Sequence, residues 1–456
     1  MKRTIPNSSV ILWAMFGVLI ASSAPGQSRL NEYVKQGLES NLVLQQKNLS
    51  LKQAQHALQT ARSYFLPTVT LLADYTSGEG GRNIAIPVGD MLNPVYATLN
   101  QMTQSDAFPQ IENVEQNFFP KNFYDARVRT TLPIINTDIH INQSIQGRQV
   151  MLKQYELETY RRELVLDIKT AYFNMLSADA AVKIYESAQT LVNRNVAINE
   201  SLLEHGKALP ANLIRSRSEA EKVKADLNMA RNRKENAQKY FNFLLNRDLD
   251  SEVILEDEFE AEIALSVETD SLAWQQREEL QMIKATQDIN ESSIQMHKLS
   301  RLPKVNAFLD VGTQASDWRY NDDSRYYLVG VQLSMPIFQG FRNNRNIQQG
   351  MLELQKNQHQ LSITSQQLDL ATSVALSDQQ TAAQNYIAAQ EQQRSAKSYF
   401  NLVEKGYRNG VNSLIEFLDA RNELTTSQLQ QSLRKYEWLT AQARVERETA
   451  SYNFQN

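Results

Sequence analysis

The chain has 456 residues, a formal net charge of −4 and no cysteine. The charge balance gives no reason to expect a nucleic-acid partner, and the missing cysteines exclude disulfides, thiol catalysis, cysteine metal sites and a lipid anchor on an N-terminal cysteine. The length allows two to four compact domains.

Residues 1–26 have the character of a signal peptide. A basic pair precedes an apolar run over residues 10–21, and small residues after it predict cleavage before Gln27. An uncleaved membrane anchor is the alternative, although about a dozen apolar residues are short for a bilayer span. We therefore expect an exported chain. No later stretch reaches the roughly 20 apolar residues of a membrane helix, so the mature protein is either soluble or meets a membrane as a β-barrel.

Four stretches alternate apolar and polar residues, which predicts strands with two different faces. The strands are expected at about 67–77, 125–135, 303–313 and 325–336, joined in pairs by a long loop at 78–124 and a short loop at 314–324. Their length of about ten residues suits a tilted membrane strand, and aromatic residues gather near the loop ends. A half-buried soluble sheet is the alternative.

Four strands cannot close a barrel, and an open sheet edge is not tolerated in lipid. A membrane-spanning version of this chain must therefore form an oligomer to which each copy contributes four strands. The polar face of the strands would then line an aqueous lumen. The charged residues expected there are Asp74, Arg127, Arg129, Lys304 and Asp310.

Two stretches, 138–205 and 342–405, predict very long helices rich in good helix formers. With Gln189 as the one exception, apolar residues recur every seven positions in both, which is the spacing of a coiled coil. The rows are Leu157, Leu164, Ala171, Ala178, Tyr185 and Val192; Ile168, Met175, Val182, Gln189, Val196 and Leu203; and Leu354, Leu361, Leu368, Ala375, Ala382, Ala389, Ala396 and Val403. A helix of about 65 residues is roughly 100 Å long, which suits a rod or a tunnel wall.

The two halves of the chain follow one pattern. Gly410 lies 204 residues after Gly206, and Arg421 lies 204 residues after Arg217. This spacing predicts an internal duplication of helix, strand, strand, long helix, turn and helix. The expected organisation is a signal peptide over 1–26, a first repeat over 27–247, a connecting segment over 248–271 and a second repeat over 272–456.

From about residue 30 to 452 the chain resembles the TolC-type outer-membrane efflux family. The resemblance rests on the duplication, on the strand-end prolines in LPTVTL, LPIINT, LPKVNA and MPIFQG, and on two helix-turn-helix tips. It implies a mainly α fold with a transmembrane β-barrel part. The implied assembly is a homotrimer in the outer membrane of a Gram-negative bacterium, with a 12-stranded barrel and a long periplasmic α-helical barrel.

The resemblance also implies a function. Drugs or other small toxic compounds would pass from an RND-type or ABC-type inner-membrane pump, through a periplasmic adaptor, to the outside. A type I secretion duct for proteins or peptides, or a metal-ion efflux duct, is the alternative within this class. An exported structural coiled-coil protein without a pore is the alternative outside it.

No motif for catalysis, cofactor binding or metal binding stands out. The five histidines are scattered and none lies in HExxH, and GKALPA at Gly206 lacks the first glycine and the Ser/Thr of a P-loop. GEGGR over 78–82 opens no predicted helix, which argues against a dinucleotide site. We expect no enzymatic activity and no cofactor.

Glycines mark the two places where long helices must reverse, since glycine adopts the left-handed cap that ends a helix. The resulting tips, 205–212 and 406–414, are expected to dock the adaptor, because loop tips on rigid helices are common contact sites. A solvated turn is the alternative. The expected docking residues are Gly206, Lys207, Ala208, Leu209, Pro210, Ala211, Asn212, Gly410, Val411, Asn412, Ser413 and Leu414.

The resemblance places a periplasmic gate at the second tip. Tyr407 stands where the family has a tyrosine that helps to hold the entrance shut. Glu416 and Asp419 stand at the family's acidic positions, where rings of acids would favour cations. Each acid has a second interpretation, because Glu416 fits a capping box with Ser413 and Asp419 suits the helix dipole.

This chain departs from the family pattern at the gate. Asn412 stands where the family has an arginine, and Ala211 and Asn212 replace a Thr-Asp pair. We therefore do not expect the family's salt bridges to lock the entrance here.

Overall fold

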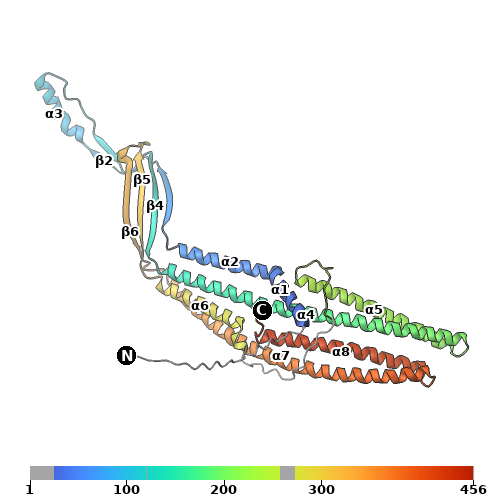
Figure 1. Ribbon diagram of the computed structural model, residues 1–456. Helices are drawn as coiled ribbons and strands as arrows, with labels where there is room; N and C mark the ends of the chain where they lie inside the picture. Colours follow the sequence, from blue (N-terminus) through green and yellow to red (C-terminus); the bar gives the residue numbers. More distant parts are fainter. Residues whose placement is uncertain (1–24, 120, 257–272, 455–456) are drawn as a thin grey trace, which may run out of the picture. The chain divides into compact units, whose positions relative to one another are not determined.

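The computed structural model describes residues 25–119, 121–256 and 273–454 (Figure 1). The predicted signal peptide, apart from its last two residues, and most of the predicted connecting segment lie outside this part. The chain divides into two compact units. The helical unit takes its described residues from 25–49, 155–256, 273–281 and 362–454, and the sheet unit from 50–119, 121–154 and 282–361.

The described chain is mainly helical. The helices are α1 (Pro25–Ser40), α2 (Leu42–Ser63), α3 (Val88–Thr103), α4 (Thr137–Glu204), α5 (Pro210–Leu244), α6 (Glu278–Leu299), α7 (Arg342–Arg408) and α8 (Leu414–Glu448), with 3-10 turns η1 (Ala273–Gln276) and η2 (Asp322–Ser324). The strands are β1 (Thr68–Thr76), β2 (Asn83–Ile86), β3 (Val114–Asn117), β4 (Phe123–Ile135), β5 (Lys304–Ser316) and β6 (Arg325–Ser334). None of these helices combines the length and the apolar character that a membrane crossing requires.

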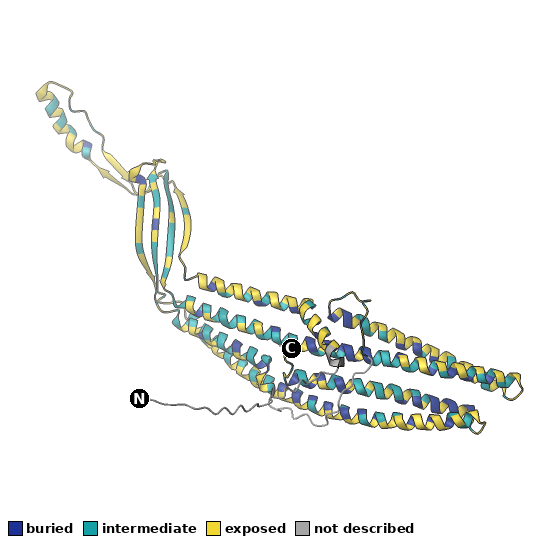
Figure 2. Ribbon diagram, in the orientation of Figure 1, coloured by how far each residue is buried: buried dark blue, intermediate teal, exposed yellow. Residues whose placement is uncertain are grey.

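Two helical hairpins, α4–α5 and α7–α8, dominate the helical unit. None of the side chains in the predicted rows of α4 and α7 is exposed, so the seven-residue spacing marks the packed faces of both helices (Figure 2). Alanine occupies many of the buried row positions on α7, among them Ala375, Ala389 and Ala396. Small side chains at these positions allow close approach of the neighbouring helix.

Aromatic packing holds α1 and α5 against α4. Tyr33 lies 6.0 Å from Tyr172 and 5.2 Å from Phe241, measured between ring centroids. The closeness explains Gly37, because a Cβ there would lie 2.3 Å from the Cδ1 atom of Ile168. Burial raises the pKa of Tyr172 to about 12, since the phenolate would lose its hydration.

The four longest strands form one antiparallel sheet in the order β1-β4-β5-β6. β1 and β6 are its edges. A cross-strand fit fixes part of the register, since a Cβ at Gly330 would lie 2.6 Å from the ring of Phe308, which is its partner on β5. Side chains alternate between the two faces of the sheet, as the sequence pattern predicts.

The stretch 78–124 contains more structure than the loop expected there. β2 and β3 pair in a separate two-stranded antiparallel sheet, and α3 lies between them. The short loop expected at 314–324 is also partly structured, because β5 continues to Ser316 and η2 follows. Turn-like residues in both stretches concealed these elements, and Pro94 lies inside α3.

Candidate functional site

The polar face of the sheet brings together all five charged residues predicted for the lumen. The register places Asp74 opposite Asp125, and Arg129 opposite Asp310, so these side chains share one face. Arg127 lies 3.6 Å from Asp74 and also pairs with Asp125. The pair with Asp74 joins β4 to β1 across the polar face, and the pair with Asp125 lies within β4.

Neighbouring pairs extend this network across the sheet. The guanidinium of Arg129 donates two hydrogen bonds to the carboxylate of Asp310, at 2.7 and 2.6 Å, and Asp310 is buried. Arg129 also lies 5.2 Å from the ring centre of Phe308. Lys304 pairs with Asp138 at the start of α4. Every predicted lumen charge therefore has an opposite charge beside it.

Sequence reasoning missed Asp125 and Asp138. The hydroxyl of Tyr326 donates to Asp125 at 2.8 Å, which ties β6 to β4 over the intervening strand. Asp125 lies two residues before Arg127, and residues two apart in a strand share one face. Strand alternation could therefore have placed Asp125 on the polar face. Asp138 lies in a helix, and no local pattern points to its partner Lys304.

The opposite face of the sheet is apolar and exposed. Its side chains at Val69, Leu71, Val329, Val331 and Leu333 are between 66 and 73 % exposed (Figure 2). Nothing in the described part of the chain covers this face. β1 and β6 are likewise without a second neighbour among the described strands.

Aromatic and large apolar side chains lie at both ends of the sheet. At the loop end, Trp318 stacks on Tyr75 at 5.4 Å and on Tyr124 at 5.7 Å. After β6, the rings of Phe338 and Phe341 meet edge to face at 5.5 Å, and both residues are exposed. Amphipathic and aromatic side chains of this kind favour the boundary between lipid and water.

The two hairpin tips end their first helices in the same way. Gly206 and Gly410 have φ values of 68° and 74°. At the first tip, Gly206 N–H donates to Leu203 O at 2.9 Å and Lys207 N–H donates to Leu202 O at 2.8 Å. The second tip repeats this pair of bonds, with Gly410 and Val411 as donors. Both are Schellman caps.

Glu416 completes a capping box at the second tip. Its carboxylate accepts a hydrogen bond from Ser413 N–H at 2.6 Å, and Glu416 N–H donates to the Ser413 hydroxyl at 3.3 Å. The backbone hydrogen bond from Ser413, followed by the Ser413 hydroxyl and the Asn412 amide, lowers the pKa of Glu416. Asp419 is exposed and has no polar partner in the described chain. Only one of the two acids is thus engaged by the cap.

Tyr407 contacts the other hairpin. Its ring stacks on Phe417 at 4.9 Å, and its hydroxyl accepts a hydrogen bond from the Asn199 amide on α4 at 3.1 Å. Asn199 is buried and also donates to the Ser216 hydroxyl on α5 at 3.2 Å. The contact between the hairpins at Tyr407 is therefore neutral.

The sequence contained a signal for Asn199. It lies seven residues after Val192, so it continues the apolar row of α4 with a polar residue. A polar side chain at such a position commonly specifies a particular partner. Asn195, four residues earlier, joins the same network by accepting from Ser216 at 2.8 Å.

A buried ion pair joins the hairpins further along α8. Arg421 pairs with Glu219 on α5, and both residues are buried. Buried charges of this kind are tolerated only in pairs, since each alone would lose its hydration without compensation. The pair fixes α8 against α5 through one specific contact.

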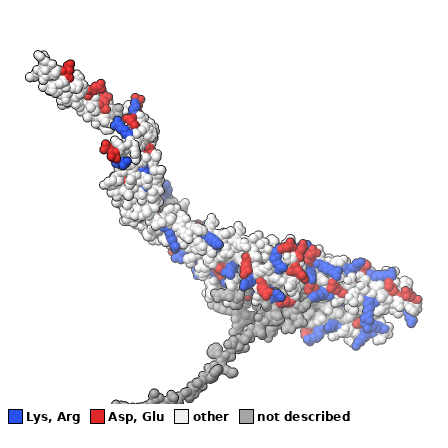
Figure 3. Space-filling view, turned by 45° about the horizontal axis from the view of Figure 1, so that its top comes forward, with Lys and Arg blue, Asp and Glu red and all other residues white. Residues whose placement is uncertain are grey.

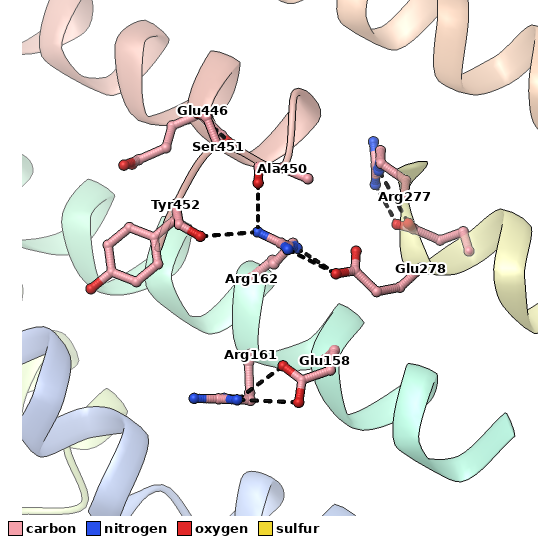
Figure 4. Close-up of polar contacts among 10 residues, drawn as sticks. Glu158, Arg161, Arg162, Arg277, Glu278, Glu446, Ala450, Ser451 and Tyr452 are labelled. Carbon is pink, nitrogen blue, oxygen red and sulfur yellow. Dashed lines mark hydrogen bonds and ion pairs between the residues drawn. The ribbon is translucent and has the colours of Figure 1, made fainter. Parts of the chain in front are cut away.

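Hydrogen bonds and ion pairs also fix the segment after α8 to α4 (Figure 4). Arg162 donates to the carbonyls of Ala450 and Tyr452, at 3.0 and 3.3 Å, and pairs with Glu278 at 2.8 Å. Nearby, buried Arg277 pairs with Glu448. This cluster joins α4, α6 and the segment after α8. The described residues contain no group of three or more His, Cys, Asp or Glu side chains that could hold a metal ion.

Comparison with known proteins gives consistent results. The profile of the family described as "Outer membrane efflux protein" matches residues 33–247 and 271–450. Outer membrane protein TolC of Escherichia coli (strain K12) is 22 % identical over 462 residues, covering 96 % of this chain and 87 % of TolC. Alkaline protease secretion protein AprF of Pseudomonas aeruginosa is 20 % identical over 308 residues, covering 65 % of this chain and 63 % of AprF. The crystal structure of the Campylobacter jejuni CmeC outer membrane channel is similar in fold, with a TM-score of 0.74 at 17 % identity, covering 98 % of this chain and 94 % of CmeC.

Proposed function

The chain belongs to the outer membrane efflux protein family, and from this premise we propose that three copies form an export duct across the outer membrane of a Gram-negative bacterium. The family is one of channels rather than of enzymes. Each copy supplies β1, β4, β5 and β6 to a 12-stranded barrel and two helical hairpins to a periplasmic α-helical barrel. The two halves of the chain act as structural repeats, each providing two strands and one hairpin.

The sheet is the observation that carries this proposal. Its apolar face is exposed and both of its edges lack a neighbour in the described chain. An exposed apolar face of this kind is unfavourable in water and suits lipid, where the open edges must also be paired. Pairing of β6 in one copy with β1 in the next removes the open edges and closes the barrel. The apolar face then lies on the outside of the barrel, against the lipid.

The polar face then becomes the wall of the lumen. Asp74, Arg127, Arg129, Lys304 and Asp310 line it as paired charges. Paired charges keep the wall hydrated without a strong net field of either sign. We therefore expect the barrel lumen to discriminate weakly between cations and anions. The hairpin tips at the periplasmic entrance should determine most of the ion selectivity.

Asp419 is the better candidate for an acidic ring at the periplasmic entrance. The Glu416 carboxylate is already engaged by Ser413, whereas Asp419 is exposed and without a polar partner in the described chain. Three copies of Asp419 around an axis would attract cations. Tyr407 belongs to the contact that keeps the entrance shut, through Asn199 instead of a salt bridge.

Conductance of purified protein in planar bilayers tests the ring. We expect Asp419→Asn to lower cation selectivity and block by multivalent cations, and Glu416→Gln to change them less, because glutamine preserves the cap. Unchanged selectivity in Asp419→Asn, and in the variant that combines it with Glu416→Gln, would contradict the role of the acids.

The tips are the proposed docking surface for a periplasmic adaptor that connects the duct to an RND-type or ABC-type inner-membrane pump. Leu209 and Val411 lie at the two tips and are 69 and 81 % exposed. Apolar side chains on rigid turns suit a protein contact. Val411→Asp should abolish transport while leaving the amount of protein in the outer membrane unchanged.

Drugs or other small toxic compounds are the proposed cargo. The name of AprF makes secreted protein the competing cargo. A strain that lacks the gene separates the two, because a drug duct predicts greater sensitivity to dyes and antibiotics, whereas a secretion duct predicts loss of a specific protein from the medium. Metal sensitivity of the same strain tests metal-ion efflux.

Membrane fractionation tests the duct itself. A barrel trimer should fractionate with outer membranes and change its gel mobility on heating. A soluble periplasmic rod would do neither, and that result would favour a structural coiled-coil protein.

A further inference from the structure

The hairpin formed by β2, α3 and β3 is an ordered part of the sheet unit. It interrupts the sequence between β1 and β4 and carries its own two-stranded sheet (Figure 1). Asparagine side chains fasten α3 to the extended segment that follows it. Asn93 donates to Ile111 O at 2.9 Å and accepts from Ile111 N–H at 2.8 Å.

The same arrangement recurs along the helix. Asn100 exchanges two hydrogen bonds with the backbone of Phe108, at 2.7 and 3.0 Å. Asn113 bonds back to the backbone and carboxylate of Asp90, at 3.1 and 3.0 Å. The Asn93 and Asn100 amides each pair with both backbone groups of one residue, as a neighbouring strand would. These bonds hold one side of α3 against the segment that follows it, so the other side of the helix faces away from that segment.

The opposite face of α3 is an exposed apolar stripe. Met91, Val95 and Met102 are 69, 51 and 77 % exposed, and Thr98 lies between them. Their spacing of three and four residues places them on one side of the helix, over about 16 Å. The stretch from residue 91 to 105 contains no charged residue. In Figure 3 the sheet is mostly white and the hairpin carries a few acidic groups, whereas the helical hairpins show many charged side chains of both signs.

We propose that this stripe packs against the same stripe in the other copies of the chain. The inference rests on the proposed trimer and adds an extracellular contact that neither the barrel nor the hairpin tips require. Three α3 helices meet around the symmetry axis and bury Met91, Val95 and Met102 against one another.

The absence of charge on the stripe favours a second copy as the partner. Residues that face a symmetry axis meet their own copies there, so a charge among them would be repelled by its equivalents. The stripe meets this condition along its whole length. Methionine also adapts its shape to irregular contacts, which suits a junction of three helices. A charged partner would find nothing on this face to pair with.

The absence of cysteine from the sequence makes the test direct. Val95→Cys places one thiol in the stripe, and Ala97→Cys places one on an exposed position about 200° round the same helix. Both variants are purified as the full chain in detergent and oxidised with copper phenanthroline. Light scattering on the same samples reports the oligomeric state.

We expect a disulfide-linked dimer, with up to two chains linked in each trimer, as a main species in Val95→Cys and as a trace in Ala97→Cys. A trimer in which Val95→Cys does not cross-link, or cross-links no better than Ala97→Cys, overturns the inference and leaves the proposed function intact. A monomeric protein overturns the proposed trimer, and the contact with it.

A second measurement does not depend on thiol geometry. Met102→Glu places three like charges in the contact, so the trimer should dissociate at a lower temperature than the unmodified protein. Gln101→Glu, next to it but outside the stripe, is the matched control. Equal dissociation temperatures in both variants and in the unmodified protein would count against the contact.

Discussion

The two hairpin tips make the same turn with different residues. Both first helices end in a Schellman cap at a glycine with positive φ. The second helices begin differently, because Leu209 is an N-cap without a side-chain bond and is followed by Pro210, whereas Ser413 forms a capping box with Glu416. One tip relies on backbone conformation alone, and the other adds side-chain hydrogen bonds.

The arginines at corresponding positions of the two hairpins, Arg217 and Arg421, also make different contacts. Arg217 on α5 is 63 % exposed and pairs with Glu200 in its own hairpin, at 2.8 Å. Arg421 on α8 occupies the corresponding position and is buried against Glu219 of the other hairpin. The arginine of the second hairpin therefore joins the two hairpins, whereas its counterpart in the first pairs within its own hairpin.

The arginines give the largest expected difference. Arg421→Leu leaves Glu219 buried without its partner, which should cost about 3–5 kcal/mol of unfolding free energy. Arg217→Leu removes an exposed pair and should cost about 0–1 kcal/mol. Urea unfolding followed by circular dichroism measures both. The double variant with Glu219→Leu should recover much of the loss, and a loss that remains complete would show that packing, not the unpaired charge, is responsible.

The tip glycines should behave alike. Gly206→Ala and Gly410→Ala each place a Cβ on a left-handed residue, at a cost of about 1–2 kcal/mol. Beyond the adjacent residues, the new Cβ would meet no atom within 4 Å at either tip, so only the backbone conformation opposes the change. Hydrogen exchange of the last turns of α4 and α7 measures the local loss. Unequal losses would mean that the tips differ in more than their capping side chains.

The N-caps should respond in opposite directions. Ser413→Ala removes the side-chain cap of α8 and should cost about 1 kcal/mol. Leu209→Ser supplies a cap that α5 lacks, at an extended residue with φ −80° and ψ 143°, and should stabilise its first turn by a similar amount. Exchange protection of the first turns of α5 and α8 reports both effects. A Leu209→Ser variant without gain would show that Pro210 alone already fixes this start.

The part of this fold that could be predicted from sequence is the part that local periodicity specifies. The rows of α4 and α7, the glycine turns and the alternation of the four long strands each repeat within one element. The partners across elements could not be predicted in this way. Asn199 continues an apolar row, but nothing local indicates Tyr407 as its partner. The hydrogen bonds of the Asn93 and Asn100 side-chain amides likewise lie in a stretch whose prolines suggested a loop.

Titration gives the smallest expected difference between the tips. Hydrogen bonds from Ser413 and Asn412 lower the pKa of Glu416, so the capping contribution is present above the ordinary glutamate pKa and is lost as pH falls through the folded value. Protection of the first turn of α8, corrected for intrinsic exchange, should therefore decrease in acid, while the first turn of α5 has no acidic cap to lose.

Glu416→Gln separates this effect from general acid destabilisation. Glutamine fits the same capping box but does not titrate, so the variant should keep its protection in acid. If the unmodified protein and Glu416→Gln lose protection in parallel, the carboxylate is not the titrating group. The second tip would then owe its acid sensitivity to contacts beyond its own cap.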